Sequence, residues 1–144
     1  MATLKAANKT IIDAITPATI LDKGTVGGNV RCMIDTYTGL GTESSGDTIE
    51  FGDELPEGAY VVGGYIVCTS MGGTPDVGDA EDPDRYVDEA ADNTATAFTD
   101  VLTGIGYKVD MTTASTPDNQ ILVTLDAAVT AAGTITVVVF YTIE

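Results

Sequence analysis

The sequence contains no histidine and no tryptophan, and only 6 of its 144 residues are Lys or Arg. Histidine is the one side chain whose unperturbed pKa lies near neutral pH, so its absence excludes Ser-His-Asp triads, Cys-His pairs and most zinc sites. The 22 acidic residues leave a formal net charge of −16. Because that charge repels nucleic-acid phosphates and anionic membrane surfaces, the sequence predicts neither as a partner.

Long apolar runs and cysteines are also scarce. The longest apolar candidates, residues 59–68 and 135–140, fall short of the ~18 residues that a membrane span needs. The first seven residues carry one Lys and no hydrophobic stretch of signal-peptide length, so we expect no secretion. Two cysteines are too few for a disulfide scaffold, and we expect Cys32 and Cys68 to be buried, reduced thiols.

The residues that are abundant are typical of β-structure. Thr occurs 23 times, Val and Ile are frequent, and the straight-chain helix formers are sparse. From residue 29 the chain alternates, with Val30, Cys32 and Ile34 on one face of a strand predicted to be half-buried. The strand-like runs number eight: 29–37, 47–51, 59–69, 74–78, 95–102, 105–112, 120–126 and 134–143. Short strands separated by turns predict an all-β antiparallel sandwich, and their unequal lengths favour a jelly roll over an up-and-down barrel.

Three segments depart from this regular pattern. Residues 1–28 contain a short apolar run, a proline and several glycines, and are interpreted as an extended N-terminal arm before a domain of residues 29–144. The alternative is that they form the first strand and a loop of the body. Gly63 and Gly64 interrupt the longest run and predict a β-bulge or a close approach of another backbone. Pro83 before an acidic segment predicts at most one short helix, over residues 84–91.

No cluster of residues predicts catalysis, a cofactor or a metal. The acidic stretch at residues 76–92 has the oxygen ligands that Ca²⁺ prefers but lacks the ligand order of an EF-hand loop, so we expect a solvated acidic loop, with a Ca²⁺ site as the alternative. Asp47, Glu50 and Asp53 offer the paired carboxylates of a glycosidase, but sugar-binding surfaces usually carry aromatic platforms and the Phe and Tyr residues are expected mostly in the core. The glycines at 39–42 and 104–106 lack the other residues of phosphate-binding or dinucleotide-binding loops.

Three pieces of the sequence resemble a known family. They are GDTIEFGDELPEGA at residues 46–59, VGD at 77–79 with DPDRYV at 82–87, and AGTITV at 132–137. Together they resemble the decoration or cement proteins of tailed bacteriophages, which are jelly-roll subunits that stabilise the phage head. The resemblance implies a non-catalytic structural protein on the capsid exterior of the virion, assembled in the host cytoplasm. A tail-fibre or head-fibre component, or a carbohydrate-binding module displayed on the virion, is the competing interpretation.

The resemblance also implies partners. These are the phage major capsid protein and further copies of the chain itself, as a homodimer or homotrimer. An extended arm can add hydrogen bonds to the edge of a neighbouring sheet, and the arm holds three of the six basic residues. The residues expected to bind the partner are therefore Lys5, Lys9, Ile11, Ile12, Ile15 and Lys23.

Overall fold

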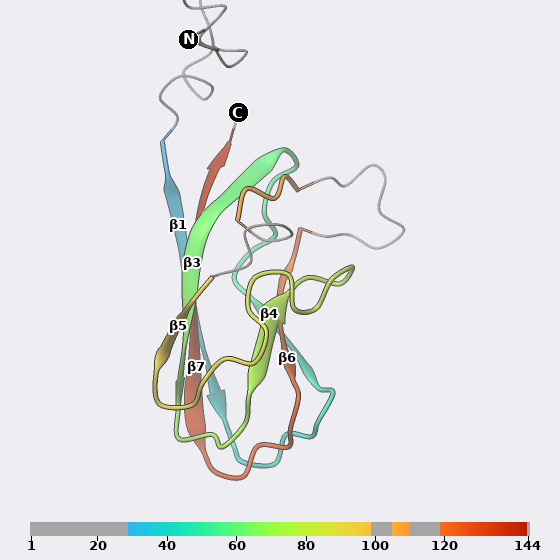
Figure 1. Cartoon of the computed structure of the whole chain (residues 1–144), viewed down its shortest axis with the longest axis vertical. Coiled ribbons are helices and arrows are strands. Elements are labelled where there is room, and N and C mark those ends of the chain that lie inside the picture. The colour runs from blue at the N-terminus through green and yellow to red at the C-terminus, as the bar shows by residue number, and fades with distance from the viewer. Residues whose placement is uncertain (1–28, 99–104, 110–118, 144) are drawn as a thin grey trace, which may run out of the picture.

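Two antiparallel sheets stacked on each other form the protein (Figure 1). The computed structural model describes residues 29–98, 105–109 and 119–143. Its strands are β1 (Arg31–Gly39), β2 (Thr48–Phe51), β3 (Ala59–Thr69), β4 (Pro75–Gly78), β5 (Ala95–Ala97), β6 (Ile121–Leu125) and β7 (Gly133–Ile143). None of the described residues lies in a helix, so none forms a helix long and apolar enough to cross a membrane.

The order of the strands alternates between the two sheets. One sheet has the order β1-β7-β3-β5 and the other β2-β6-β4. Odd-numbered strands thus lie in the first sheet and even-numbered strands in the second, so each connection crosses from one sheet to the other. The predicted all-β antiparallel sandwich is confirmed, while the jelly-roll designation stays a prediction.

The core lies between the sheets and is built by period-2 alternation. Ile121, Val123 and Leu125 of β6 and Ile135, Val137 and Val139 of β7 are buried at alternate positions, because side chains on a strand point alternately to its two faces. The largest fully buried side chains are Tyr86, Phe51, Leu55, Ile66, Ile121, Leu125, Ile135, Val61, Val77, Val87, Val109 and Val123. The rings of Tyr86 and Phe98 stack with their centroids 5.1 Å apart, which ties the loop after β4 to the segment that follows β5.

The described chain has seven strands, whereas the sequence predicts eight. Residues 105–109 do run antiparallel beside the start of β3, where the Val61 N–H donates to the Tyr107 carbonyl and the Val109 N–H donates to that of Ala59. The chain turns sharply at Gly106, whose φ is 88°, and only one bridge forms there, between Tyr60 and Lys108. Residues 110–112 and 99–102 of the predicted strands lie outside the described part.

The predicted helix over residues 84–91 is wrong. This segment forms turns and a bridge to β4, in which the N–H groups of Val77 and Val87 donate to each other's carbonyls. Arg85, Tyr86 and Val87 are all buried, and three consecutive side chains span about 200° around a helix, more than the single face that a surface helix buries. Glu89 has a φ of 54°, which also breaks helical geometry.

The predicted bulge is confirmed. The register between β3 and β7 shifts between Val61 and Gly63, so one extra residue of β3 is accommodated there. Because of this shift, the two halves of β3 keep their apolar side chains on the core side, with Val61 before the bulge and Ile66 after it.

Candidate functional site

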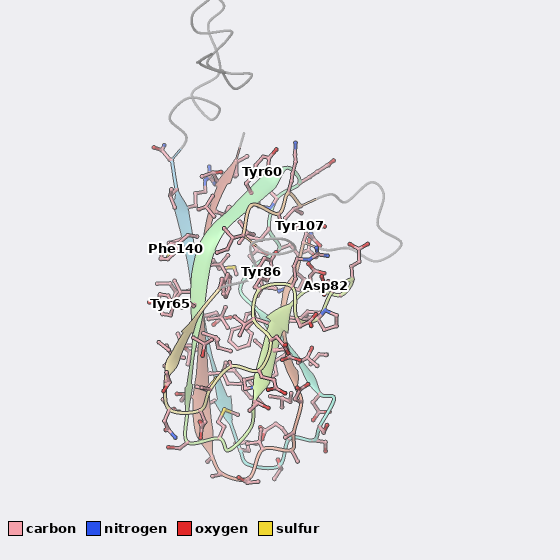
Figure 2. The ribbon with its side chains drawn as sticks, in the orientation of Figure 1. Tyr60, Tyr65, Asp82, Tyr86, Tyr107 and Phe140 are labelled. Carbon is pink, nitrogen blue, oxygen red and sulfur yellow. The ribbon has the colours of Figure 1, made fainter. Side chains whose placement is uncertain are left out.

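The side of the β1-β7-β3-β5 sheet that points away from the core, here called the outer face, has no charged side chain at its described strand positions. A cation, Lys108, lies at the edge of this face as the bridge partner of Tyr60. Its positions are Cys32, Ile34, Thr36 and Thr38 on β1, Thr134, Thr136, Val138, Phe140 and Thr142 on β7, Tyr60, Val62, Gly63, Tyr65, Val67 and Thr69 on β3, and Ala95 and Ala97 on β5. Figure 2 shows Phe140 and Tyr65 on the side of this sheet away from Tyr86 and Asp82. The absence of charge is unusual in a chain with a formal charge of −16.

Exposed apolar side chains are concentrated on the outer face. Among the described residues the exposed large hydrophobics are Val30, Ile34, Leu40, Val62 and Tyr65. Three of them belong to the outer face, with exposed fractions of 65% for Ile34, 42% for Val62 and 38% for Tyr65. Val30 directly precedes β1. Contiguous exposed apolar surface on a folded domain marks a site of interaction more often than chance placement.

Strand register joins these residues into rows. Ile34, Val138, Tyr65 and Ala97 are successive partners across all four strands. Val138 is only 3% exposed although it points away from the core, so its neighbours on the outer face already cover it. The face is therefore a packed apolar surface and not a set of isolated side chains.

Four threonine hydroxyls of the outer face satisfy one another in pairs. The Oγ1 atoms of Thr36 and Thr136 lie 2.8 Å apart, and those of Thr69 and Thr134 lie 2.7 Å apart. Hydroxyls that already have a partner within the sheet lose little when water is removed. Covering these four hydroxyls with a partner therefore costs little desolvation.

The opposite side of the molecule is acidic. Glu50 and Asp76 occupy outward positions of the β2-β6-β4 sheet, and the loop that follows β4 packs against this side. The Asp76 carboxylate accepts a hydrogen bond from the Glu89 N–H at 2.8 Å. Burial, with a smaller contribution from Asp126, raises the pKa of Asp76 to about 6.

The acidic stretch at 76–92 is organised around one buried ion pair. The Arg85 guanidinium binds the Asp79 carboxylate, and the side chains are 7% and 0% exposed. The same guanidinium lies 3.8 Å from the centroid of the Tyr107 ring. Asp79 Oδ1 also accepts the N–H groups of Glu81 and Asp82, each at 3.0 Å. These contacts shape the loop, and the described residues hold no group of three or more His, Cys, Asp or Glu side chains placed to bind a metal ion.

One hollow of about 630 Å³ brings together two of the three carboxylates considered for hydrolysis. Asp47 and Glu50 line it with Glu43, and Asp53 does not. Backbone N–H groups at residues 40–42 and the Tyr37 hydroxyl donate to Glu43, which lowers the pKa of that carboxyl to about 2. A carboxyl with so low a pKa is ionised near neutral pH and cannot act as a general acid there.

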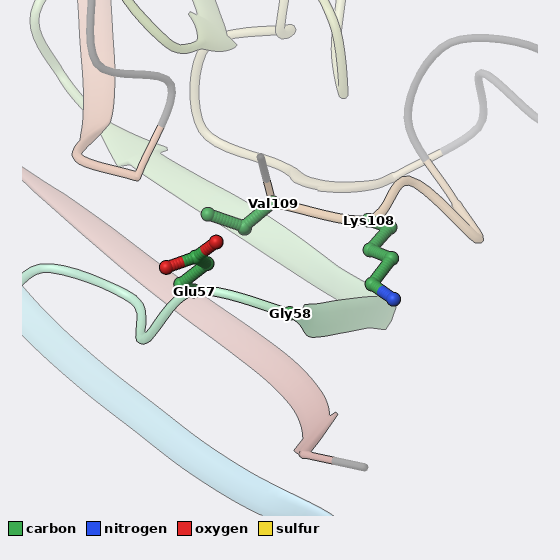
Figure 3. Close-up of a pocket in the computed structure, with 4 residues that line it drawn as sticks. All are labelled: Glu57, Gly58, Lys108 and Val109. Atoms are coloured by element: carbon green, nitrogen blue, oxygen red, sulfur yellow. The ribbon is translucent and has the colours of Figure 1, made fainter. Parts of the chain in front are cut away.

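A second hollow, of about 480 Å³, lies between the start of β3 and the segment at residues 105–109. Its lining is Glu57, Gly58, Lys108 and Val109 (Figure 3). Lys108 lies with its Nζ 5.3 Å from the centroid of the Tyr60 ring. The lining contains no nucleophile beside a base, so it offers no arrangement for covalent catalysis.

The partner-binding residues expected from the sequence, Lys5, Lys9, Ile11, Ile12, Ile15 and Lys23, lie outside the described residues. Cys68 is 1% exposed, as predicted, but the prediction for Cys32 is wrong because it is exposed on the outer face. The alternation of Val30, Cys32 and Ile34 is therefore real, and its apolar face points outward. Sequence reasoning missed the outer face because it assigned this alternation to the core.

Comparison with solved structures finds a likeness in fold. No family model matches the chain, and no curated protein matches it. A solved structure described as "Cyanophage Pam1 capsid asymmetric unit" contains a chain that is similar over the full length of both chains, with a TM-score of 0.71 and 23% sequence identity. This likeness shows the fold.

Proposed function

We propose that this protein is a non-catalytic structural protein of a phage virion, which binds the outside of the head and cements neighbouring major capsid subunits. The observation that carries the proposal is an uncharged, apolar outer face on an acidic chain. It is supported by the shared fold with a chain from a cyanophage capsid. A protein that works by presenting surface needs such a face and needs no reactive groups.

The distribution of charge suits this role. A cement protein bridges subunit boundaries, and contacts repeated by the symmetry of the shell add through effective concentration. One contact of modest affinity is sufficient for each copy. Exposed carboxylates that do not contact the shell then face solvent, where they discourage both aggregation of particles and adhesion to released DNA.

The N-terminal arm, residues 1–28, belongs to the same proposal. Lys5, Lys9 and Lys23 are half of the chain's basic residues, whereas all but two of its 22 acidic residues follow residue 28. This asymmetry favours contact between the arm and an acidic neighbouring subunit. Replacing these three lysines by Gln in the full chain is expected to weaken head binding and its dependence on salt. Unchanged binding at low salt would remove the arm from the proposal.

Quantitative co-sedimentation with phage heads that lack the protein tests the function directly. We expect saturable binding at a copy number related to the symmetry of the shell, together with greater resistance of the heads to heat or chelator. If the purified chain does not bind heads at any concentration, the cementing function is wrong.

Recognition of carbohydrate is the second candidate, because Tyr65 and Phe140 present aromatic rings on the outer face (Figure 2). Aromatic rings can stack against the apolar faces of sugars, but sugar hydroxyls also need polar partners, and the outer face offers mainly paired threonines. A glycan array with the wild type and Tyr65→Ala separates the candidates. Binding of a defined glycan that the variant loses would favour a carbohydrate-binding module.

A further inference from the structure

We infer that the occupant of the outer face is the outer face of a second copy of this chain, so that the protein acts as face-to-face pairs. The inference deepens the proposed function and rests on it only for the place where the pairs act. Three observations support it: the distribution of charge on the molecule, the shape of the outer face and the area that this face offers for contact.

Charge selects a second copy as the partner. Two copies with a formal charge of −16 each repel one another wherever carboxylates meet. The described outer sides of the β2-β6-β4 sheet and its loops carry exposed carboxylates such as Glu50, Asp84 and Asp88, which suit a basic partner. The strands of the outer face hold no carboxylate to repel a like molecule or to attract a basic one, and the charge at its edge, Lys108, is a cation. It is therefore the described surface through which two copies approach at least electrostatic cost.

The partner's contact surface must then be the same face. A second copy that placed any acidic surface against Ile34 or Tyr65 would bury unpaired carboxylates, which is strongly unfavourable. Contact through identical surfaces is two-fold symmetric and closes after two chains. Pairing of this kind leaves no apolar face for further growth, so it yields dimers and not fibres.

The sheet has a surface suited to such packing. Phe140 is the register partner of Gly63, and Ile34, Val138 and Tyr65 form the next row along the strands. Tyr65 and Ile34 project from the face while Val138 between them is covered, so the row has raised ends and a lower centre. Two such sheets can interdigitate at the spacing of about 10 Å that stacked sheets adopt.

The area available sets the strength of the pair. The long strands β1, β7 and β3 have 9, 11 and 11 residues. At ~3.4 Å per residue and ~4.8 Å between strands, they form a rectangle of roughly 30 Å by 14 Å. With β5 and side-chain relief, a pair buries on the order of 1,000 Å² in total, which lies near the lower limit for specific interfaces. We therefore expect a weak pair in solution that strengthens when copies are held close together on a shell.

Cys32 is a natural reporter for this contact. It lies on the outer face opposite Phe140, and it is exposed. The only other thiol, Cys68, is buried, and burial raises the pKa of that thiol to about 11. Maleimide labelling of the folded wild-type chain therefore reports on the outer face without any engineered residue.

The test measures the sedimentation mass of the full chain and the labelling rate of Cys32, from micromolar to near-millimolar concentration. We expect the mass to rise from one chain towards two and the labelling rate to fall over the same range. Ile34→Asp is expected to weaken this association at least tenfold. Thr48→Asp adds the same charge on the opposite sheet, at an exposed position, and is expected to leave the association unchanged.

Three results would overturn the inference. The first is a wild type of single-chain mass with constant Cys32 labelling at all concentrations, and the second is association that Ile34→Asp does not weaken. The third is protection of Cys32 on heads that carry too few copies for two of them to meet, which would show that a capsid subunit covers the face and would leave the proposed function standing. Pairing through the face by a chain that does not bind heads would instead support the inference and refute the proposed function.

Discussion

Phe140 of β7 lies opposite Gly63 of β3, and a methyl group added at Gly63 would sit 3.9 Å from the Phe140 ring, an ordinary contact. A side chain at the next residue, Gly64, would lie on the opposite, core-facing side of the sheet. A methyl group there would collide with the carbonyl oxygen of Val138 and with the Phe98 ring. Two adjacent glycines at one bulge thus have different reasons to be glycine, and they form a matched pair for mutation.

We predict that Gly64→Ala destabilises the fold by about 1–3 kcal/mol, because backbone and a core ring must move to admit the methyl group. Gly63→Ala is expected to change the free energy of unfolding by less than about 1 kcal/mol, since its methyl group has room and the substitution restricts the unfolded chain. Urea denaturation of both variants measures the difference. Equal destabilisation by the two would show that the placement of the bulge is wrong.

The two thiols are predicted to react very differently. In the folded protein one thiol, Cys32, should react rapidly with a maleimide, because it is exposed. Cys68 should react only on unfolding, since it is 1% exposed and its pKa is raised to about 11. Mass spectrometry of native and denatured samples should count one and two labels. Two rapid labels in the native protein would contradict the assignment of β3 to the core.

Asp76 makes stability depend on pH. Its folded-state pKa of about 6 lies above the ordinary value of 3.8, because burial disfavours the charged form. The folded protein thus holds this proton more tightly than the unfolded chain, so the associated stability is present at about pH 4 and is lost as the pH rises through 6.

Asp76→Asn should remove that loss. The amide keeps an acceptor for the Glu89 N–H and carries no charge to desolvate. We expect it to stabilise the protein by about 1–3 kcal/mol at pH 7.5 and to have little effect near pH 4. Urea denaturation at both pH values tests this, with Glu57→Gln as a control that removes one exposed charge elsewhere. A gain in stability that is equal at both pH values would contradict the raised pKa.

The ion pair of Arg85 and Asp79 is predicted to be a major structural contact. Arg85→Met leaves the Asp79 carboxylate, which is 0% exposed, with its two backbone donors and without a cation. We expect a loss of about 3–5 kcal/mol, as is typical when one partner of a buried pair is removed. Adding Asp79→Asn should recover part of the loss, which a double-mutant cycle by thermal unfolding would measure. Additive effects of the two substitutions would show that the pair is not coupled.

Period-2 alternation predicted most of the fold. The bounds of β3 match the predicted run 59–69, and β2, β4, β6 and β7 lie within about one residue of theirs. These strands alternate strongly and end at turn residues, so local sequence decides them. The helix at 84–91 was mispredicted because Pro83 and acidic residues favour a helix locally, whereas burial of Tyr86 and Val87 against β4 outweighs that preference.

The candidate site could not be assigned from the sequence for a different reason. Alternation reports that one face of a strand is apolar, and it does not say whether that face meets the core or an outside partner. In β1 the side with Met33 and Tyr37 packs against the core, while Cys32 and Ile34 face outward. The signal was present in the sequence, and only the stacking of the second sheet assigns the direction.

The most direct test of the account compares head binding by the wild type, Ile34→Asp and Thr48→Asp in co-sedimentation, after each variant has been shown to unfold cooperatively. The account predicts saturable binding by the wild type and Thr48→Asp, and at least tenfold weaker binding by Ile34→Asp. Equal binding by all three would contradict the claim that the protein works through the uncharged outer face of the β1-β7-β3-β5 sheet.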